Sequence, residues 1–117
     1  MAAPRVLVVD DDEAVRIVTT EMLKRSGFEY ESVASGGEAL NRLKEAHFDL
    51  ILLDVGMPIM SGVETYDFIR QDLPEQKVLF MTGYAEEDIT DLDNPNTYIL
   101  SKPFSLKAFN DTLSSII

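Results

Sequence analysis

Cysteine is absent from this sequence of 117 residues, and it has no long hydrophobic run. The absence of cysteine excludes a disulfide framework and any zinc or redox site built from thiolates. No apolar run approaches the roughly 20 residues needed to cross a bilayer, and the N-terminal sequence MAAPRV lacks the charged-then-apolar pattern of a secretory signal peptide. We therefore expect a cytoplasmic protein with no membrane partner.

Positive charge is also scarce. The chain has 10 Lys and Arg residues against 21 Asp and Glu residues, which gives a formal net charge of −11. Direct binding of nucleic acid needs a basic face that neutralises phosphates, so this balance argues against nucleic acid as a partner. With 45% hydrophobic residues the chain can bury a real core. We expect one domain over residues 1–117, with residues 1–4 disordered at the N-terminus.

The sequence does contain a regular alternation of short β-type runs with longer segments of helical period. Strands are expected at residues 6–9, 28–34, 50–54, 77–82 and 97–100, and helices at 12–26, after Ser35, at about 62–73, at 85–92 and after Ser105. This alternation indicates βα units around a parallel sheet. Right-handed crossovers and a strand order that reverses near the first strand predict a flavodoxin-like, doubly wound three-layer α/β sandwich. The expected architecture has five parallel strands in the order 2-1-3-4-5 and five helices.

Polar residues stand at the carboxyl end of four predicted strands, where sheets of this kind bind their ligands. Asp10 and Asp11 follow the first strand, Asp54 ends the third, Thr82 ends the fourth and Lys102 follows the fifth. Taken singly, each has an ordinary explanation as a helix cap, a turn residue or a solvated charge. Together they predict a functional site on one rim of the sheet.

The chemistry of this set favours a metal ion and a phosphoryl group. Asp10, Asp11 and Asp54 would bring like charges together, and a cation is needed to compensate them. Because only oxygen ligands are offered, the expected ion is Mg²⁺. Asp54 can then act as a nucleophile toward phosphorus, while Mg²⁺, the Lys102 ammonium and the Thr82 hydroxyl neutralise the transferred group.

Four stretches resemble the receiver domain of two-component response regulators in order and spacing, over nearly the whole chain: VLVVDDDEAVR, DLILLDVGMPIMSG, KVLFMTGYAEE and SKPFS. Parts of them are similar to receivers attached to hybrid histidine kinases. The resemblance implies a signalling module in a phosphorelay, and not an enzyme, that catalyses its own phosphorylation and slow dephosphorylation. Its partner would be a sensor histidine kinase, a histidine phosphotransfer protein, or a kinase fused to it in a longer chain.

The resemblance also implies individual roles at the metal site. Asp54 would receive the phosphoryl group from a phosphohistidine of the partner and would also contact Mg²⁺. Asp11 would ligate the ion directly, Asp10 would act through a metal-bound water, and Gly56 would contribute its backbone carbonyl.

A further implied role is switching. Thr82 and Lys102 match the family's switch hydroxyl and phosphate-binding lysine, and phosphorylation would shift the face formed by the helix at 85–92, the strand at 97–100 and the last helix. Three residues before the lysine the family often has Tyr or Phe, whereas this chain has Ile99. Strand alternation directs the adjacent Tyr98 to the opposite face, so we interpret Tyr98 as a partly buried or surface aromatic residue, and keep both positions as switch candidates.

The first helix offers a candidate surface for the partner. Ala14 and Ile17 lie toward its charged face, because its predicted core stripe consists of Val15, Val18, Met22 and Leu23. In the family this helix docks onto the helical bundle of the kinase, so Ala14 and Ile17 are candidate kinase contacts.

Two other functions remain open from the residues alone. A haloacid-dehalogenase-like, Mg²⁺-dependent phosphatase would use Asp10 and Asp12 as its Asp-x-Asp motif, but only Asp111 follows Lys102 as a further acidic ligand, and Asp54 would have no role. A phosphorylation-independent interaction domain would have a degenerate pocket, whereas all of the expected site residues are present.

Overall fold

The computed structural model of the chain describes residues 3–56, 61–82, 94–101 and 104–117. In chain order its elements are β1 (Arg5–Val9), α1 (Glu13–Arg25), β2 (Glu29–Val33), α2 (Gly36–Glu45), β3 (Leu50–Asp54), α3 (Gly62–Asp72), β4 (Val78–Thr82), β5 (Thr97–Ser101) and α4 (Leu106–Ile116). The helix expected at residues 85–92 lies outside the described residues. No helix among the residues described here is long and apolar enough to span a bilayer.

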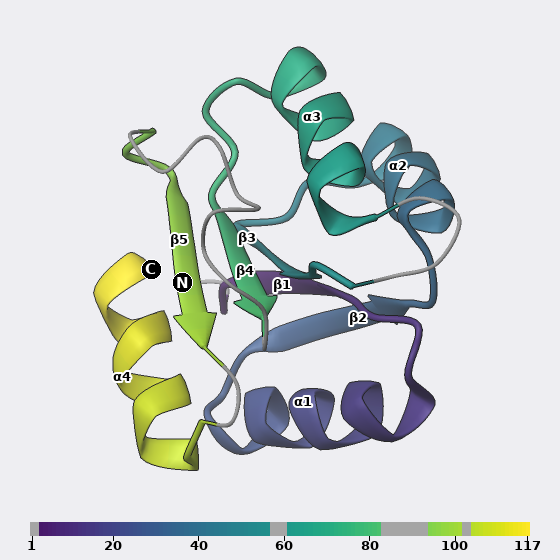
Figure 1. Cartoon of the computed structure of the whole chain (residues 1–117). Helices are drawn as coiled ribbons and strands as arrows, with labels where there is room; N and C mark the ends of the chain where they lie inside the picture. Colours follow the sequence, from purple (N-terminus) through teal and green to yellow (C-terminus); the bar gives the residue numbers. More distant parts are fainter. Residues whose placement is uncertain (1–2, 57–60, 83–93, 102–103) are drawn as a thin grey trace.

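The five strands form one parallel sheet in the order β2-β1-β3-β4-β5, which confirms the predicted topology (Figure 1). The order reverses at β1, whose neighbours are β2 on one side and β3 on the other. Val9 of β1 is paired with Leu53 of β3. The residues that follow these two, Asp10 and Asp54, are therefore brought next to each other at the carboxyl ends of the strands.

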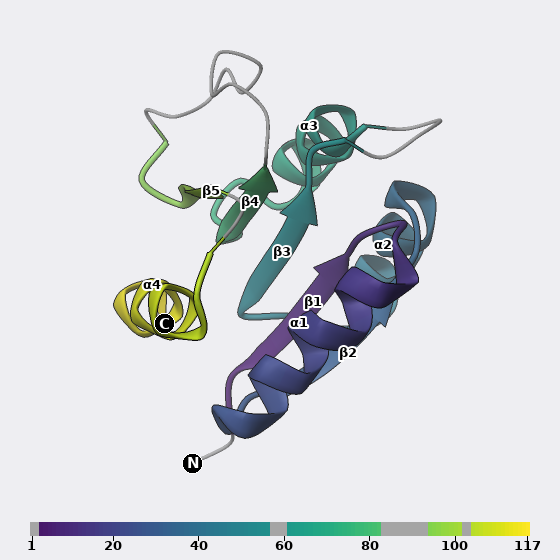
Figure 2. The same cartoon turned by 60° about the horizontal axis from the view of Figure 1, so that its bottom comes forward.

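Helices cover both faces of the sheet, and the strands alternate their side chains between two buried clusters (Figures 1 and 2). Leu7 and Val9 belong to the cluster on the side of α2 and α3. Val6 and Val8 belong to the cluster on the side of α1 and α4, where α1 lies against β1 and β2 (Figure 2). Because β1, β3 and β4 are apolar on both faces, they form the central layer of a three-layer sandwich.

Short polar residues cap the amino ends of α1, α2, α3 and α4. The Asp12 carboxylate accepts hydrogen bonds from the backbone N–H groups of Ala14 and Val15 at the start of α1. Ser35 and Ser105 cap α2 and α4 through their hydroxyls. Ser61 caps α3 in a reciprocal capping box with Glu64.

One position of the predicted core stripe of α1 is wrong. Val18 is 58% exposed, whereas Thr19 is 1% exposed. Thr19 stands four residues after Val15 and four before the fully buried Leu23, so these three share the side of the helix that faces the sheet. The helical wheel favours burial of Val18 because its side chain is apolar. The small side chain of Thr19, with one methyl and one hydroxyl group, is buried in its place.

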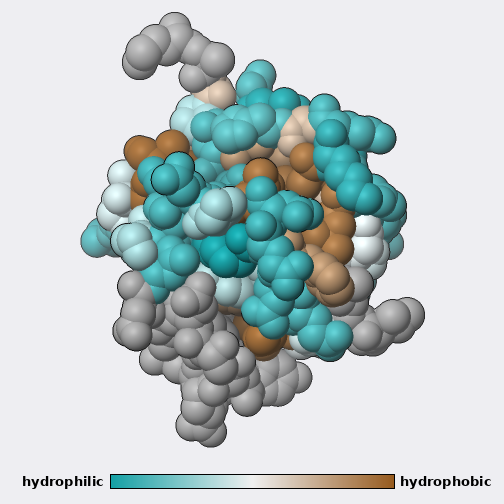
Figure 3. Space-filling model, turned by 90° about the horizontal axis from the view of Figure 1, so that it is seen from above, coloured by the Kyte–Doolittle hydropathy of each residue, from teal (hydrophilic) through white to brown (hydrophobic). Residues whose placement is uncertain are grey.

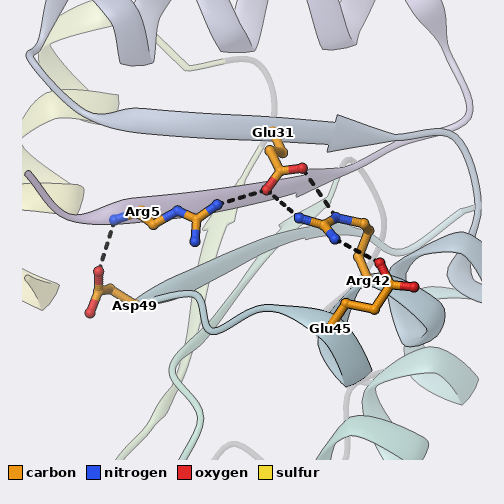
Figure 4. A network of polar contacts seen from close by, with 5 residues as sticks. All are labelled: Arg5, Glu31, Arg42, Glu45 and Asp49. Carbon is orange, nitrogen blue, oxygen red and sulfur yellow. Dashed lines mark hydrogen bonds and ion pairs between the residues drawn. The ribbon is translucent and has the colours of Figure 1, made fainter.

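A network of charged side chains covers the outer part of the sheet beside α2 (Figure 4). The Glu31 carboxylate on β2 accepts hydrogen bonds from both Nε and Nη2 of Arg42, at 3.1 and 2.8 Å, and from Nη2 of Arg5 at 2.9 Å. The hydrogen bond from Arg42 lowers the pKa of Glu31 and raises that of Arg42, and the charges of Arg42 and Arg5 lower the Glu31 pKa further. Both guanidinium groups lie over the buried ring of Phe48. The network thus holds β1, β2 and α2 together.

Most of the described surface seen from above is hydrophilic, with smaller hydrophobic areas between (Figure 3). A hollow of about 640 Å³ lies near the amino ends of β3 and β4, lined mainly by residues 47–49 and 72–77. Asp10, Asp11 and Asp54 do not line this hollow. This hollow is therefore separate from the predicted site.

Candidate metal centre

Three carboxylates meet at the carboxyl ends of β1 and β3. Asp10, Asp11 and Asp54 each offer an oxygen atom, and these atoms all lie within 4.8 Å of one another. Asp10 is 1% exposed, Asp54 is half-buried and Asp11 is exposed. The cluster is thus fixed on one side by the sheet and open to solvent on the other. Its oxygen-only donor set fits a hard divalent cation such as Mg²⁺.

The turn between β1 and α1 fixes the position of Asp10. Its Oδ1 atom accepts a hydrogen bond of 2.9 Å from the backbone N–H of Asp12. Its backbone N–H donates to the carbonyl of Val33 on β2 at 3.2 Å. Its own carbonyl accepts a hydrogen bond of 2.7 Å from Nη1 of Arg16 on α1.

Asp12 is engaged elsewhere, which bears on the phosphatase alternative. Its Oδ1 accepts from the backbone N–H groups of Ala14 and Val15 at 2.9 and 3.3 Å. This carboxylate oxygen is therefore used as a helix cap, whereas the phosphatase motif needs Asp12 beside Asp10 as a catalytic group.

Gly62 allows α3 to begin directly against the peptide that follows Asp54. Its N–H donates to the carbonyl of Val55 at 3.0 Å. A Cβ atom at Gly62 would lie 2.1 Å from the carbonyl oxygen of Asp54 and 2.7 Å from Cα of Val55, distances that no side chain can occupy. Gly62 is not among the site residues predicted from the sequence. The sequence does carry a sign of this role: a glycine stands directly after the Ser61 cap, at a helical position where a better helix former would be expected.

The remaining predicted site residues are only partly described. Thr82 is the last residue of β4, one position beyond the Met81 that is paired with Asp54. The side chain of Thr82 and the whole of Lys102 lie outside the described residues. Gly56 is exposed, two residues after Asp54.

Ile99 and Tyr98 lie on opposite faces of β5, as strand alternation predicts. Ile99 packs against the cluster that contains Tyr66 and Phe80, on the side of α3. Tyr98 packs against the cluster on the side of α1 and α4. On the same face, α3 contributes an aromatic ring: the centroid of the Tyr66 ring lies 5.1 Å from that of Phe80, and the Tyr66 hydroxyl lies 2.7 Å from Oγ1 of Thr97 at the start of β5.

Exposed apolar side chains gather on the first half of α1, next to the carboxylates. Ile17 is 60% exposed and Val18 is 58% exposed, and Ala14 is also exposed. Positions 14, 17 and 18 lie on one face of a helix because residues three and four apart are neighbours. The structure thus places Ala14 and Ile17 at the surface and adds Val18 to them.

Comparison with known proteins agrees with this arrangement. Residues 6–114 match the family model of the response regulator receiver domain. The response regulator receiver protein CpdR of Brucella abortus is 34% identical over 105 residues, which cover 88% of this chain and 88% of CpdR. The sensor kinase CckA of the same species is 34% identical over 116 residues, which are 96% of this chain and 12% of CckA.

Solved structures agree as well. The chemotaxis protein CheY4 of Vibrio cholerae has a TM-score of 0.91 at 32% identity, covering 99% of this chain and 100% of CheY4. The response regulator TrrA of Thermotoga maritima has a TM-score of 0.86 at 29% identity, covering 97% of this chain and 99% of TrrA. TrrA has been solved in complex with Mg²⁺ and BeF, and also in complex with the histidine kinase ThkA. With the family model matched over nearly the whole length, this chain belongs to the family of response regulator receiver domains.

Proposed function

We propose that Asp54 is the phosphoryl acceptor of this receiver domain. The transfer depends on Mg²⁺, and the donor is a phosphohistidine of a partner kinase or phosphotransfer protein. The observation that carries the proposal is the meeting of Asp10, Asp11 and Asp54 within 4.8 Å on the rim of the sheet. Membership of the receiver family places the chain in two-component signalling. The complexes of TrrA with Mg²⁺ and BeF and with a histidine kinase support the same assignment by similarity.

Each carboxylate has a distinct place in this proposal. Asp11 is exposed and would ligate Mg²⁺ directly, while the buried Asp10 would act through a bound water. Asp54 and the backbone carbonyl of Gly56 complete the protein ligands. When bound, Mg²⁺ neutralises charge on the carboxylates and on the phosphoryl oxygens.

The transfer itself forms one bond and breaks another. A carboxylate oxygen of Asp54 attacks phosphorus, and the phosphorus–nitrogen bond of the donor breaks, so that the histidine nitrogen leaves with the electron pair. The product is an acyl phosphate, and the Thr82 hydroxyl and the Lys102 ammonium are proposed to bind its oxygens. Its hydrolysis returns Asp54 to the carboxylate, and we expect it to be slow because Gly56 has no side chain that can orient a water.

Partner and output surfaces follow from the same proposal. The exposed apolar residues of α1, Ala14, Ile17 and Val18, are proposed to contact the helical bundle of the kinase, beside the acceptor. Phosphorylation is proposed to shift the face that includes β5 and α4, with Ile99 or Tyr98 as the responding side chain.

The proposal is tested by intact-mass analysis of the chain after incubation with acetyl phosphate, with and without Mg²⁺. We expect a gain of one phosphoryl group that needs Mg²⁺, is lost in Asp54→Ala, and is kept in Asp67→Ala, which removes an exposed aspartate of α3. Phosphorylation that persists in Asp54→Ala but disappears in Asp10→Ala would instead favour the phosphatase alternative.

A further inference from the structure

We propose that Arg16 is a positioning residue of the metal centre, which holds the Asp10 carbonyl and thereby keeps the carboxylates of Asp10 and Asp11 oriented for a divalent cation. This inference rests on the proposed function, because it takes these carboxylates to be the Mg²⁺ ligands. Arg16 contacts the backbone of the site, and the proposed role is to orient the carboxylates.

Arg16 contacts Asp10 directly, and the backbone of Arg16 is itself held by a hydrogen bond in the first turn of α1. Nη1 of Arg16 donates to the carbonyl oxygen of Asp10 at 2.7 Å, a short bond with a charged donor. The backbone N–H of Arg16 donates to the carbonyl of Asp12 at 3.0 Å, within the first turn of α1. The side chain is half-buried, and it reaches back from the helix over the turn that carries the acidic residues.

The carbonyl that Arg16 holds belongs to the peptide joining Asp10 to Asp11. Rotation of that peptide plane changes the backbone angles on both sides of it, and so changes the direction of the Asp11 side chain relative to Asp10. The hydrogen bond from Asp12 N–H to Oδ1 of Asp10 fixes the neighbouring part of the turn. Repulsion among the three carboxylates favours an outward movement of the exposed Asp11, and the bond from Arg16 resists it.

The positive charge of Arg16 affects Mg²⁺ affinity in the direction opposite to positioning, so the sign of the change in affinity tells the two effects apart. A guanidinium near a cation site repels the cation, so removal of its charge alone strengthens Mg²⁺ binding. Loss of positioning weakens Mg²⁺ binding instead. We infer that positioning dominates, since groups that orient metal ligands typically change metal affinity 10- to 100-fold.

The same helix supplies a matched control. Arg25 lies nine residues after Arg16, about 13 Å further along α1, and its Nε donates to the exposed Glu21 at 3.1 Å. Arg25→Met removes the same charge from the same helix without touching the acidic turn.

The experiment is calorimetric titration of the purified chain with MgCl₂, without any phosphodonor. We expect Arg16→Met to weaken Mg²⁺ affinity by about tenfold. Arg16→Lys should also weaken it, because an ammonium on a flexible stem does not reproduce the planar guanidinium. Arg25→Met should bind Mg²⁺ like the wild type. Equal or tighter binding by Arg16→Met than by Arg25→Met would overturn the inference.

Thermal unfolding separates positioning from a general loss of stability. A bound ligand raises Tm by mass action, so wild type and Arg25→Met should show a rise of Tm with Mg²⁺, and Arg16→Met should show a smaller one. A merely structural role would lower Tm by the same amount with and without Mg²⁺, and would contradict the inference. If the wild type itself does not bind Mg²⁺, the proposed function fails together with the inference, whereas equal binding by wild type and Arg16→Met removes the inference alone.

Discussion

Gly62 and Asp54 are eight residues apart in the chain, yet the backbone of one rests against the backbone of the other. The side chain that is missing at Gly62 leaves room for the carbonyl oxygen of Asp54, which a Cβ atom would approach to 2.1 Å. This contact sets where α3 begins relative to the proposed acceptor. The sequence contains the glycine but not its neighbour in space, so its steric role follows only from the structure.

Gly62→Ala should therefore disturb both the fold and the site. Because the clash is with backbone atoms, α3 or the peptide after Asp54 must move, and we expect a loss of about 1–3 kcal/mol in the free energy of unfolding. Phosphorylation of Asp54 by acetyl phosphate should fall as well. Urea unfolding and intact-mass analysis measure the two effects.

The control is Gly37→Ala in α2, where the new Cβ would meet no atom closer than 4.0 Å. Alanine is the better helix former, so this variant should be unchanged or stabilised by about 0.5–1 kcal/mol. Equal stability of the two variants would show that the close approach at Gly62 is not significant.

Glu31 gives the stability of the protein a defined pH dependence. Its pKa in the folded state lies below the ordinary value of 4.5, first because of the hydrogen bond from Arg42. A carboxyl group with a lowered folded-state pKa stabilises the fold above its unfolded-state pKa, and this contribution is lost as pH falls through the folded-state value. Since the side chain is about a third exposed, solvent screens the effect and we expect it to be small.

Glu31→Gln should accordingly be less stable than wild type at neutral pH, and the difference should shrink as pH falls below 4.5. Urea unfolding over this pH range measures it. Glu29→Gln, an exposed position on the same strand, serves as the control. A difference between Glu31→Gln and wild type that grows in acid would contradict the account.

At the scale of whole elements, the sequence was informative wherever one pattern dominates. β3 is apolar on both faces and its predicted limits at 50 and 54 are those of the structure. The serine caps of α2 and α4 were predictable because a hydroxyl before a helical pattern has one common use. The face of α1 was predicted less well: the helical wheel favours the apolar Val18, whereas tertiary packing buries the next residue, Thr19, and leaves Val18 exposed.

The connection of α3 to β5 could not be predicted, since it joins polar groups distant in the sequence. The hydroxyls of Tyr66 and Thr97 are 2.7 Å apart in the interior, and Arg70 donates to both of them. This network ties α3 to the start of the strand that carries Ile99. It lies on the face where the family often has an aromatic residue of β5 itself.

Tyr66→Phe removes one hydroxyl from this network while keeping the ring. We expect a loss of about 1–2 kcal/mol in the free energy of unfolding, because the Thr97 hydroxyl and Nε of Arg70 each lose a hydrogen-bond partner. Urea unfolding measures it, with Tyr30→Phe at an exposed position of β2 as the control. Equal stability of the two variants would mean that the network does not hold α3 to β5.

At the scale of the whole molecule, the sheet brings distant segments to one rim and leaves α1 beside it. The parallel order places the ends of β1 and β3 together, and this is why the acidic residues after β1 could be assigned to a common site with Asp54 from sequence alone. The exposed apolar face of α1 begins directly after that site. Donor contact and phosphoryl transfer are therefore expected on the same side of the molecule.

Ile17→Asp should slow transfer from a histidine phosphotransfer protein or kinase that phosphorylates the wild type, because a charge would replace apolar contact area. Phosphorylation by acetyl phosphate should stay unchanged, since that donor does not need the surface. Phe68→Asp, at an exposed apolar position of α3, is the matched control. Equal transfer rates for wild type and Ile17→Asp would exclude α1 as the contact surface.

The central claim, that Asp54 is the acceptor, is tested most directly by finding the phosphorylated residue itself. Borohydride reduces an acyl phosphate to an alcohol, so a phosphorylated aspartate is converted to homoserine, which peptide mass analysis can place in the sequence. After incubation with acetyl phosphate and Mg²⁺, we predict homoserine at position 54 and unchanged aspartate at positions 10 and 11. Homoserine at position 10, with Asp54 intact, would contradict the account.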